Sequence, residues 1–281
     1  MSDLLIPFGI EIDTGETIEP EDSKKGRACN CKCPGCKAPL LSRHSTINRT
    51  HFAHDSKHPN AIPENECDFS GAVAVSMMAM EVAKSLSGEL FQTVDYEKIH
   101  TFDCCSFSSE NFVITNKKAL EIDCVATKVC IDNIVFDYKL RIGSYRILIL
   151  FIHRNKPVPN LNGMNTIHNE KIGVLSLNLD SFNSVELKLN PRLKFSDLVK
   201  TFILKTGERS WLYHPNENEL FNKVINKHEC PSLKIPEELY KSYYFECLRC
   251  THKWSEMKQH SIVCPQCHVD QLQIRDITSS R

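Results

Sequence analysis

Two short segments of this 281-residue chain concentrate side chains that bind soft metal ions. The first, CNCKCPGCKAPLLSRHSTINRTHFAH at 29–54, contains a Cys-x-x-Cys pair and ends in two histidines. Two thiolates and two imidazoles make a tetrahedral ligand set that suits zinc. The sequence therefore predicts a zinc site with the ligands Cys33, Cys36, His51 and His54.

The spacing leaves the ligand set of this first site open. Cys29 and Cys31 are near enough along the chain to replace one histidine, and Cys67 could fold back to the site. The competing interpretation, unliganded thiols and surface histidines, does not explain why these residues cluster.

The second segment, CLRCTHKWSEMKQHSIVCPQC at 247–267, places two Cys-x-x-Cys pairs thirteen residues apart. This spacing is typical of a zinc ribbon. Four thiolates already fill a tetrahedron, so the nearby histidines are expected to be spectators, and no position remains for a substrate water. We expect a second zinc ion with a fold-stabilising role. Its ligands are predicted to be Cys247, Cys250, Cys264 and Cys267.

The rest of the cysteines are interpreted from the expected compartment. The N-terminus has no secretion signal, and no apolar run approaches the roughly 20 residues of a membrane span, which predicts a cytoplasmic protein without a membrane partner. In a reducing compartment, close pairs favour metal binding or redox chemistry over disulfides. A thiol-transfer protein is one hypothesis, although tetrahedral spacing argues against it. The scattered cysteines expected to be ordinary buried residues are Cys104, Cys105, Cys124 and Cys130.

Charge is distributed unevenly along the chain, although the net charge is −1. Residues 1–23 carry acidic and no basic side chains, whereas 24–58 carry eight basic side chains against Asp55 alone. A basic module suits contact with phosphate backbones, and a solvated charged face is the alternative. The predicted partner is nucleic acid, chiefly DNA. The predicted contacts are Lys32, Lys37, Arg43 and Arg49.

A further candidate site lies among acidic residues in the middle of the chain. Asp123 and Asp137 fall on consecutive predicted strands, and Lys139 follows Asp137 by two residues. Carboxylates on adjacent strands can hold Mg²⁺ or Mn²⁺, and a lysine on the same face can orient the attacking water. The pattern resembles that of PD-(D/E)xK nucleases, and the alternative is a strand with acids on its solvent face.

The secondary structure predicted around these groups indicates a core that mixes helices and strands. A helix rich in small residues and methionine is expected at 68–90, and its methionines are assigned to the core. Gly143-Ser144 predicts a hairpin turn. Strands are expected at 111–116, 119–131, 133–142, 145–153 and 172–179, and helices at 196–206 and 216–228. We therefore predict an α+β (α/β-like) nuclease-type core at 67–229, between an N-terminal zinc-binding module at 1–66 and a C-terminal zinc ribbon at 230–281.

Several of these segments resemble a known family. PFGIEIDTGETI, CKCPGCKAPLL and HFAH, followed by Cys67 and a helix, resemble the N-terminal part of the competence protein CoiA-like family. ERSWLYHP at 208 and the closing zinc ribbon resemble its more distant relatives. The resemblance implies a prokaryotic DNA-processing protein with a PD-(D/E)xK-type nuclease core. It also implies partners from a DNA-processing or defence system.

The resemblance also exposes a departure. It assigns metal binding to Asp132 and requires Glu-x-Lys or Glu-x-Gln on the next long strand, but YRILILFIH at 145–153 has no acidic residue. Two functions stay open: a divalent-metal-dependent nuclease, or a degenerate nuclease-fold protein that binds DNA or assists assembly. The candidate catalytic residues are Asp123, Asp132, Asp137 and Lys139.

Overall fold

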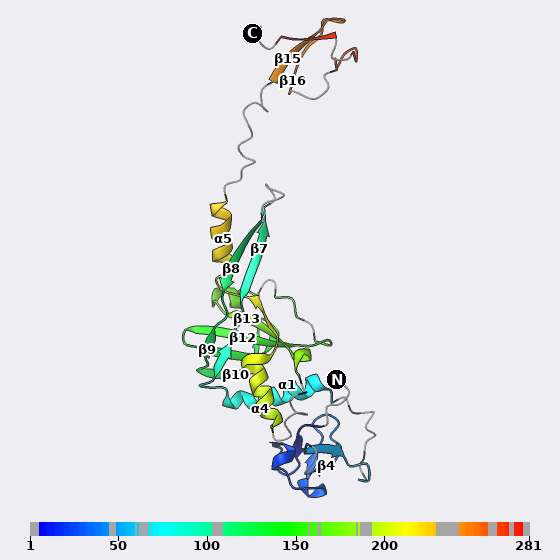
Figure 1. Cartoon of the computed structure of the whole chain (residues 1–281), viewed down its shortest axis with the longest axis vertical. Coiled ribbons are helices and arrows are strands. Elements are labelled where there is room, and N and C mark those ends of the chain that lie inside the picture. Colours follow the sequence, from blue (N-terminus) through cyan, green and yellow to red (C-terminus); the bar gives the residue numbers. More distant parts are fainter. Residues whose placement is uncertain are drawn as a thin grey trace. The chain divides into compact units, whose positions relative to one another are not determined.

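The structure is a computed structural model of the chain (Figure 1). It describes residues 6–44, 49–59, 61, 67, 69–102, 109–156, 158–161, 164–183, 185, 193–228, 242–257, 263–269 and 273–277. The chain divides into two compact units: Met1–Lys98 with Asn111–Lys223, and Ile99–Glu110 with Val224–Arg281. The first unit therefore contains both the N-terminal basic segment and the central sheet.

A five-stranded sheet forms the centre of the first unit, in the order β10-β11-β12-β13-β14 (Figure 1). Its strands are β10 (Cys124–Ile131), β11 (Ile134–Ile142), β12 (Tyr145–Ile152), β13 (Gly173–Asn178) and β14 (Arg209–Tyr213). β12 and β13 run parallel, and all other neighbours are antiparallel. The two central strands read as nearly continuous apolar runs because both of their faces are covered.

Helices cover the two faces of this sheet. One face carries α1 (Gly71–Val82) and α4 (Phe195–Thr201), whose apolar side chains share a core with alternate residues of β11, β12 and β13. The Ser70 hydroxyl caps α1 by accepting the Val73 N–H. The other face carries α2 (Asn165–Asn169) and a smaller core. The fold is a mixed α+β fold.

Shorter elements surround the sheet. The 3-10 helix η4 (Ala83–Ser85) continues α1, η5 (Leu179–Ser181) follows β13, and the π-helix η6 (Phe202–Thr206) continues α4. Two small sheets pair β6 (Leu90–Gln92) with β9 (Ala119–Glu121), and β7 (Tyr96–Thr101) with β8 (Ser109–Thr115). α5 (Glu217–Lys227) follows β14. A three-stranded sheet consists of β15 (Ser242–Cys247), β16 (Lys253–Met257) and β17 (Ile274–Asp276).

Among its described residues, the N-terminal module contains two small sheets and two 3-10 helices. The first sheet has the order β2-β1-β3, and the second is a β4-β5 hairpin. Its elements are β1 (Gly9–Glu11), β2 (Thr17–Ile18), η1 (Pro20–Asp22), η2 (Arg27–Cys29), β3 (Cys31–Lys32), β4 (Leu40–Arg43) and β5 (His51–His54).

This module is docked on the start of α4. The Glu19 carboxylate accepts the Phe195 N–H at 2.7 Å and the Ser196 hydroxyl. Asp22 pairs with Lys194 at 2.8 Å, and Phe8 stacks on the ring of Phe195. Because the first N–H groups of a helix lack partners within the helix, the Glu19 carboxylate is a cap supplied by the module.

The structure contains most of the predicted helices and strands, but it corrects one predicted strand and the predicted burial of two cysteines. Gly143 (φ 56°) and Ser144 form the expected turn, because Ile142 pairs with Tyr145. The segment predicted as one strand at 119–131 bends at Ile122 and Asp123 and contributes to two different sheets. The prediction that Cys124 and Cys130 are buried is wrong: both are exposed, because β10 is an edge strand. The predicted buried residues Cys104 and Cys105 lie outside the described residues.

Within the part of the chain that the structure describes, none of the helices has the length and apolar character needed to cross a membrane.

Candidate metal centres

All three Cys-x-x-Cys pairs fold into the same turn. In the first, the Cys33 N–H donates to the Ala38 carbonyl at 2.8 Å, and the Lys37 N–H donates to the Cys33 carbonyl at 3.1 Å. The turns that start at Cys247 and Cys264 repeat both hydrogen bonds at the same spacing. The residue after each second cysteine has a positive φ: Lys37 (64°), Thr251 (60°) and His268 (55°). Each turn thereby presents two thiols side by side.

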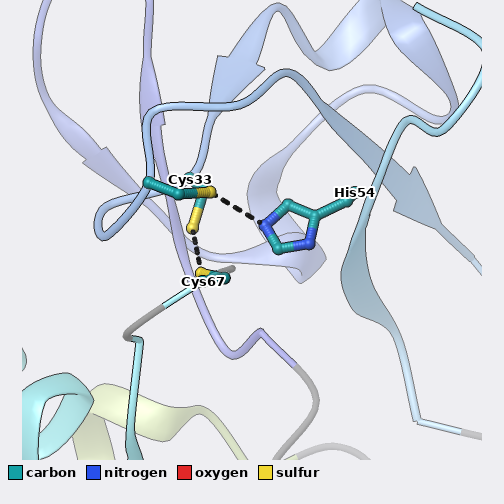
Figure 2. A group of neighbouring side chains, drawn as sticks. Cys33, His54 and Cys67 are labelled. Carbon is teal, nitrogen blue, oxygen red and sulfur yellow. Dashed lines mark hydrogen bonds between the residues drawn. The ribbon is translucent and has the colours of Figure 1, made fainter. Parts of the chain in front are cut away.

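The N-terminal cluster consists of Cys33, Cys36, His54 and Cys67, whose ligand atoms all lie within 4.8 Å of one another. Cys33, His54 and Cys67 converge from different segments in Figure 2. The Cys33 and Cys67 sulfurs are 3.7 Å apart, and the Cys36 sulfur is 3.3 Å from His54 Nε2. A tetrahedral zinc ion with normal bond lengths separates two sulfurs by about 3.8 Å and a sulfur from a nitrogen by about 3.5 Å. The four residues fit the ion.

Burial also changes proton binding at this cluster. Burial raises the pKa of the Cys33 thiol to about 12, against the lowering effect of the Cys36 and Gly35 N–H groups. The thiol therefore keeps its proton unless a cation replaces it, so metal binding releases protons and strengthens as the pH rises.

The predicted ligand His51 is replaced by Cys67. HFAH is the strand β5, in which Phe52 and His54 are buried while His51 and Ala53 are half-buried. Side chains three residues apart on a strand point to opposite faces, so the two histidines cannot share an ion. His51 Nδ1 instead lies 3.0 Å from the Arg49 carbonyl.

Cys67 reaches the cluster because the chain returns there just before α1. Two residues later, Phe69 packs against Gly35 of the first turn, where an added Cβ would approach the Phe69 Cβ to 2.9 Å. Cys29 and Cys31 do not join the cluster: both are buried in the module core, where their thiols donate to the carbonyls of Leu40 and Cys29. The centre thus links the module to the start of α1.

The C-terminal cluster contains the four predicted cysteines, with ligand atoms within 4.8 Å of one another: Cys247, Cys250, Cys264 and Cys267. Two sulfur pairs, Cys247 with Cys267 and Cys250 with Cys264, are each 3.6 Å apart, far beyond a disulfide bond and close to zinc geometry. Burial raises the pKa of Cys247, but hydrogen bonds from the N–H groups of Cys250 and Arg249 and from the thiols of Cys250 and Cys267 outweigh it and bring the pKa to about 7. This cluster is positioned to bind a metal ion.

The structure does not gather the predicted catalytic acids. Asp123 accepts the Gly143 N–H at 2.8 Å at one end of β11, and Asp132 lies in the turn at the other end. A nine-residue strand spans roughly 30 Å, so these carboxylates cannot share an ion. The Asp132 carboxylate accepts hydrogen bonds from the Thr166 N–H and hydroxyl. Asp132 and Asn133 (φ 47° and 65°) form the two-residue hairpin turn between β10 and β11.

Asp137 is fully buried in the middle of β11. Its Oδ1 accepts from Lys128 at 2.7 Å, and its Oδ2 accepts from Lys156 at 2.9 Å and from the Phe151 N–H at 2.8 Å. Lys139 pairs along the ladder with Leu148 and is not among these donors. Both oxygens of Asp137 are therefore occupied by cations and a backbone donor of the protein itself. Among the described residues, no metal-ligand group other than the two cysteine clusters is formed.

Three of the four basic residues predicted to contact nucleic acid have exposed or half-buried side chains, and the fourth is mostly buried. Lys37 and Arg43 are exposed and Lys32 is half-buried. Arg49 is mostly buried: its guanidinium donates to the Leu193 carbonyl at 2.6 Å and lies 3.5 Å from Glu21. It joins the module to the segment before α4. Arg27, which sequence reasoning did not select, is exposed.

The ERSWLYHP motif has a structural role in the first unit. Arg209 is buried and donates to the carbonyls of Gly207, Gln92, Leu204 and Phe202, which closes the end of η6. The Trp211 ring nitrogen donates to the Val94 carbonyl at 3.0 Å. Burial lowers the pKa of Arg209 to about 10, and the four carbonyls accept hydrogen bonds from its N–H groups.

No protein-family model matches the sequence, and neither a curated protein nor a solved structure matches the chain significantly. Its class therefore follows from its own fold and sites: a mixed α+β protein with two Cys/His clusters that are positioned to bind metal.

Proposed function

We propose that the protein is a nucleic-acid-binding module, stabilised by two zinc ions, whose nuclease-type core binds without cutting. It acts on DNA as part of a larger DNA-processing or defence assembly in a prokaryotic cytoplasm. The two cysteine clusters supply the zinc sites, since their sulfur separations fit tetrahedral zinc. The resemblance to CoiA-like proteins supports the DNA-processing context.

The observation that carries the proposal is how the N-terminal module divides its charges. Glu19 and Asp22 contact the start of α4, and Glu21 lies beside the mostly buried Arg49, while Glu11, Asp13 and Glu16 remain at least partly exposed. The basic side chains outside ion pairs with described residues are Lys24, Lys25, Lys32, Lys37, Arg43 and Lys57. A surface of this kind attracts phosphate backbones.

Binding without cleavage is supported by the acidic residues of the core. Asp123 and Asp132 lie at opposite ends of β11, and both oxygens of Asp137 are held by lysines and a backbone N–H. A divalent ion at Asp137 would have to displace two cations and would find no second carboxylate among the described candidates.

The test measures binding and cleavage of DNA together. We expect affinity for a labelled duplex of about 20 base pairs to fall steeply between about 50 and 200 mM salt, because each neutralised phosphate releases counterions. Replacing Lys25, Lys32 and Arg43 with glutamine and Lys37 with asparagine should reduce the magnitude of the salt slope by about three to four. Asparagine suits Lys37 because it tolerates the positive φ.

The matched control removes four exposed lysines outside the module: Lys84, Lys117, Lys171 and Lys205. It should leave the salt slope nearly unchanged. Magnesium or manganese should produce no cleavage of single- or double-stranded DNA. Divalent-dependent cleavage that Asp137→Asn abolishes would instead establish the nuclease, and absence of any binding at low salt would remove the nucleic-acid function.

A further inference from the structure

The N-terminal module carries a surface pocket of about 490 Å³ beside its metal centre. We call the apolar part of its lining the floor; it consists of Ile12, Cys31, Cys36, Ala38, Pro39 and Leu40. We call the polar part the rim; it consists of Arg27, Asn30, Lys32, Lys37, Asp55 and His58. The pocket volume falls in the range of sites for small organic ligands, about 300 to 1,000 Å³.

A buried carboxylate positions one of the rim cations. Asp55 is 3% exposed, and its two oxygens accept from Arg27 Nε at 2.5 Å and Nη2 at 3.1 Å, while its Oδ1 also accepts the Lys57 N–H. The Arg27 side chain remains 60% exposed. The hydrogen-bonding capacity of the Asp55 carboxylate is thus taken by groups of the protein. The carboxylate also fixes the plane of the Arg27 guanidinium, which can still donate from Nη1.

The charge balance of the pocket favours an anion. Arg27, Lys32 and Lys37 outnumber Asp55 by two positive charges. A zinc ion bound by three thiolates and one histidine carries one net negative charge, which does not reverse this balance. Asp13, which accepts the Asn30 side-chain amide at 2.8 Å, is exposed to solvent and lies outside the lining. The Lys37 ammonium donates to the Pro34 carbonyl, so its position is also fixed.

An apolar floor next to a cationic rim favours an anion that also carries an apolar group. A bare phosphate would contact the rim and leave the floor unused, whereas a nucleoside phosphate has a flat, weakly polar base in addition to its anionic group. Ile12 is 48% exposed and offers an aliphatic surface for such a base. The lining contains no Phe, Tyr or Trp ring, so the base would pack chiefly against aliphatic groups. An acidic peptide carries the charge but has no flat apolar group for the floor.

We propose that this pocket holds one nucleoside phosphate unit of a single-stranded nucleic acid, with the phosphate at Arg27, Lys32 and Lys37 and the base on the floor near Ile12. The inference rests on the proposed function and assigns a specific subsite within it. Long-range attraction by the other cations brings the strand to the module, and the pocket then holds one unit of it.

The experiment compares two double variants that remove equal charge. Lys32→Gln with Lys37→Asn changes the pocket, whereas Lys25→Gln with Arg43→Gln changes exposed cations outside it, which the antiparallel bridge between Gly26 and Ser42 holds close together. The probe is fluorescein-labelled pentathymidylate, measured by anisotropy at low salt. The pocket variant should lose about tenfold or more in affinity and the control about threefold or less. Zinc content, which should stay at the wild-type value, shows that each variant keeps its metal centres.

A second arm tests the contact with the base. Ile12→Ala should weaken pentathymidylate severalfold and leave an abasic probe with the same number of phosphates unchanged, because only the floor contact is lost.

Three outcomes would overturn the inference. Equal losses in the two double variants would show diffuse electrostatic binding, and nucleic-acid binding itself would stand. Competition by polyglutamate as effective as competition by unlabelled pentathymidylate would make the pocket a site for acidic peptides. Failure of the wild-type protein to bind either pentathymidylate or long DNA at low salt would remove the proposed function together with the pocket.

Discussion

At the scale of single residues, strand geometry decides which histidine belongs to the N-terminal metal centre. A spacing of three residues brings two side chains together on a helix but places them on opposite faces of a strand. His54 is buried beside Cys36, whereas His51 contacts the backbone of Arg49. The fourth ligand atom comes from Cys67, which lies 31 positions after Cys36 in the chain.

Zinc content tests this assignment. Wild-type protein should contain two zinc ions per chain. Cys67→Ser should contain one, because serine is a poor zinc ligand and the remaining three groups leave the tetrahedron open. His51→Ala should keep two, which elemental analysis of the purified proteins will show. Loss of one ion from His51→Ala, with Cys67→Ser unaffected, would contradict the assignment.

Backbone conformation at the cysteine turns is a second feature of single residues. Thr251 follows the second cysteine of its turn at φ 60°, a conformation that is unfavourable for a β-branched side chain. Glycine adopts this φ without strain, so Thr251→Gly should stabilise the turn by about 1 kcal/mol. Zinc transfer to a chelator should therefore slow severalfold.

Thr251→Val is the matched control, because it removes the hydroxyl that donates to the Cys250 carbonyl but keeps the branched side chain. It should not slow zinc transfer. Faster zinc loss from Thr251→Gly than from wild type would show that the turn is not strained.

At the scale of elements, α4 depends on a residue from the N-terminal module. The residue before the helix, Lys194, supplies no side-chain cap, and the Glu19 carboxylate accepts the Phe195 and Ser196 N–H groups instead. Glu19, from the acidic N-terminal segment, therefore attaches the module to the core. Arg49 adds a hydrogen bond to the Leu193 carbonyl at the same place.

Removing this cap should loosen α4. Glu19→Ala should lower the free energy of unfolding by about 0.5 to 2 kcal/mol, as the loss of a helix cap usually does. Urea unfolding measures the change, and hydrogen exchange should accelerate at the Phe195 and Ser196 amides. Glu16→Ala, a change of the same type at an exposed position of the module, should alter stability by less than about 0.5 kcal/mol. Equal effects of the two substitutions would contradict a specific cap.

Strand pairing also explains why Asp137 differs from the catalytic residue predicted at this position. The ladder between β10 and β11 pairs Thr127 with Tyr138 and Val129 with Phe136, but omits the pair of Lys128 with Asp137. Lys128 takes a positive φ of 52°, and the Asp137 carboxylate accepts the Phe151 N–H of the next strand. A buried backbone donor needs a partner, and here a side chain provides it.

At the scale of the whole molecule, charge segregation has a structural meaning. Glu19 and Asp22 contact the start of α4, whereas Asp13 and Glu16 are exposed, and most of the basic residues at 24–58 are exposed as well. A net charge of −1 therefore coexists with a strongly basic surface on one module. The two metal clusters belong to different compact units, one in each.

By itself, the sequence determined the features that depend on local chemistry. Two Cys-x-x-Cys pairs at thirteen-residue spacing specified the C-terminal cluster, since each turn is closed by hydrogen bonds within six residues. Gly143-Ser144 specified a hairpin, and the apolar runs at 145–153 and 172–179 specified two buried strands. These features need no information about distant parts of the chain.

Only the tertiary structure decided which distant residues meet. It brought Cys67 rather than His51 to the N-terminal cluster, because the face of a strand depends on what the strand packs against. It held Asp137 between Lys128 and Lys156, nine and nineteen positions away, and placed Asp123 and Asp132 at opposite ends of one strand. The contacts of an acidic side chain on a strand follow from register and burial, and spacing along the sequence specifies neither.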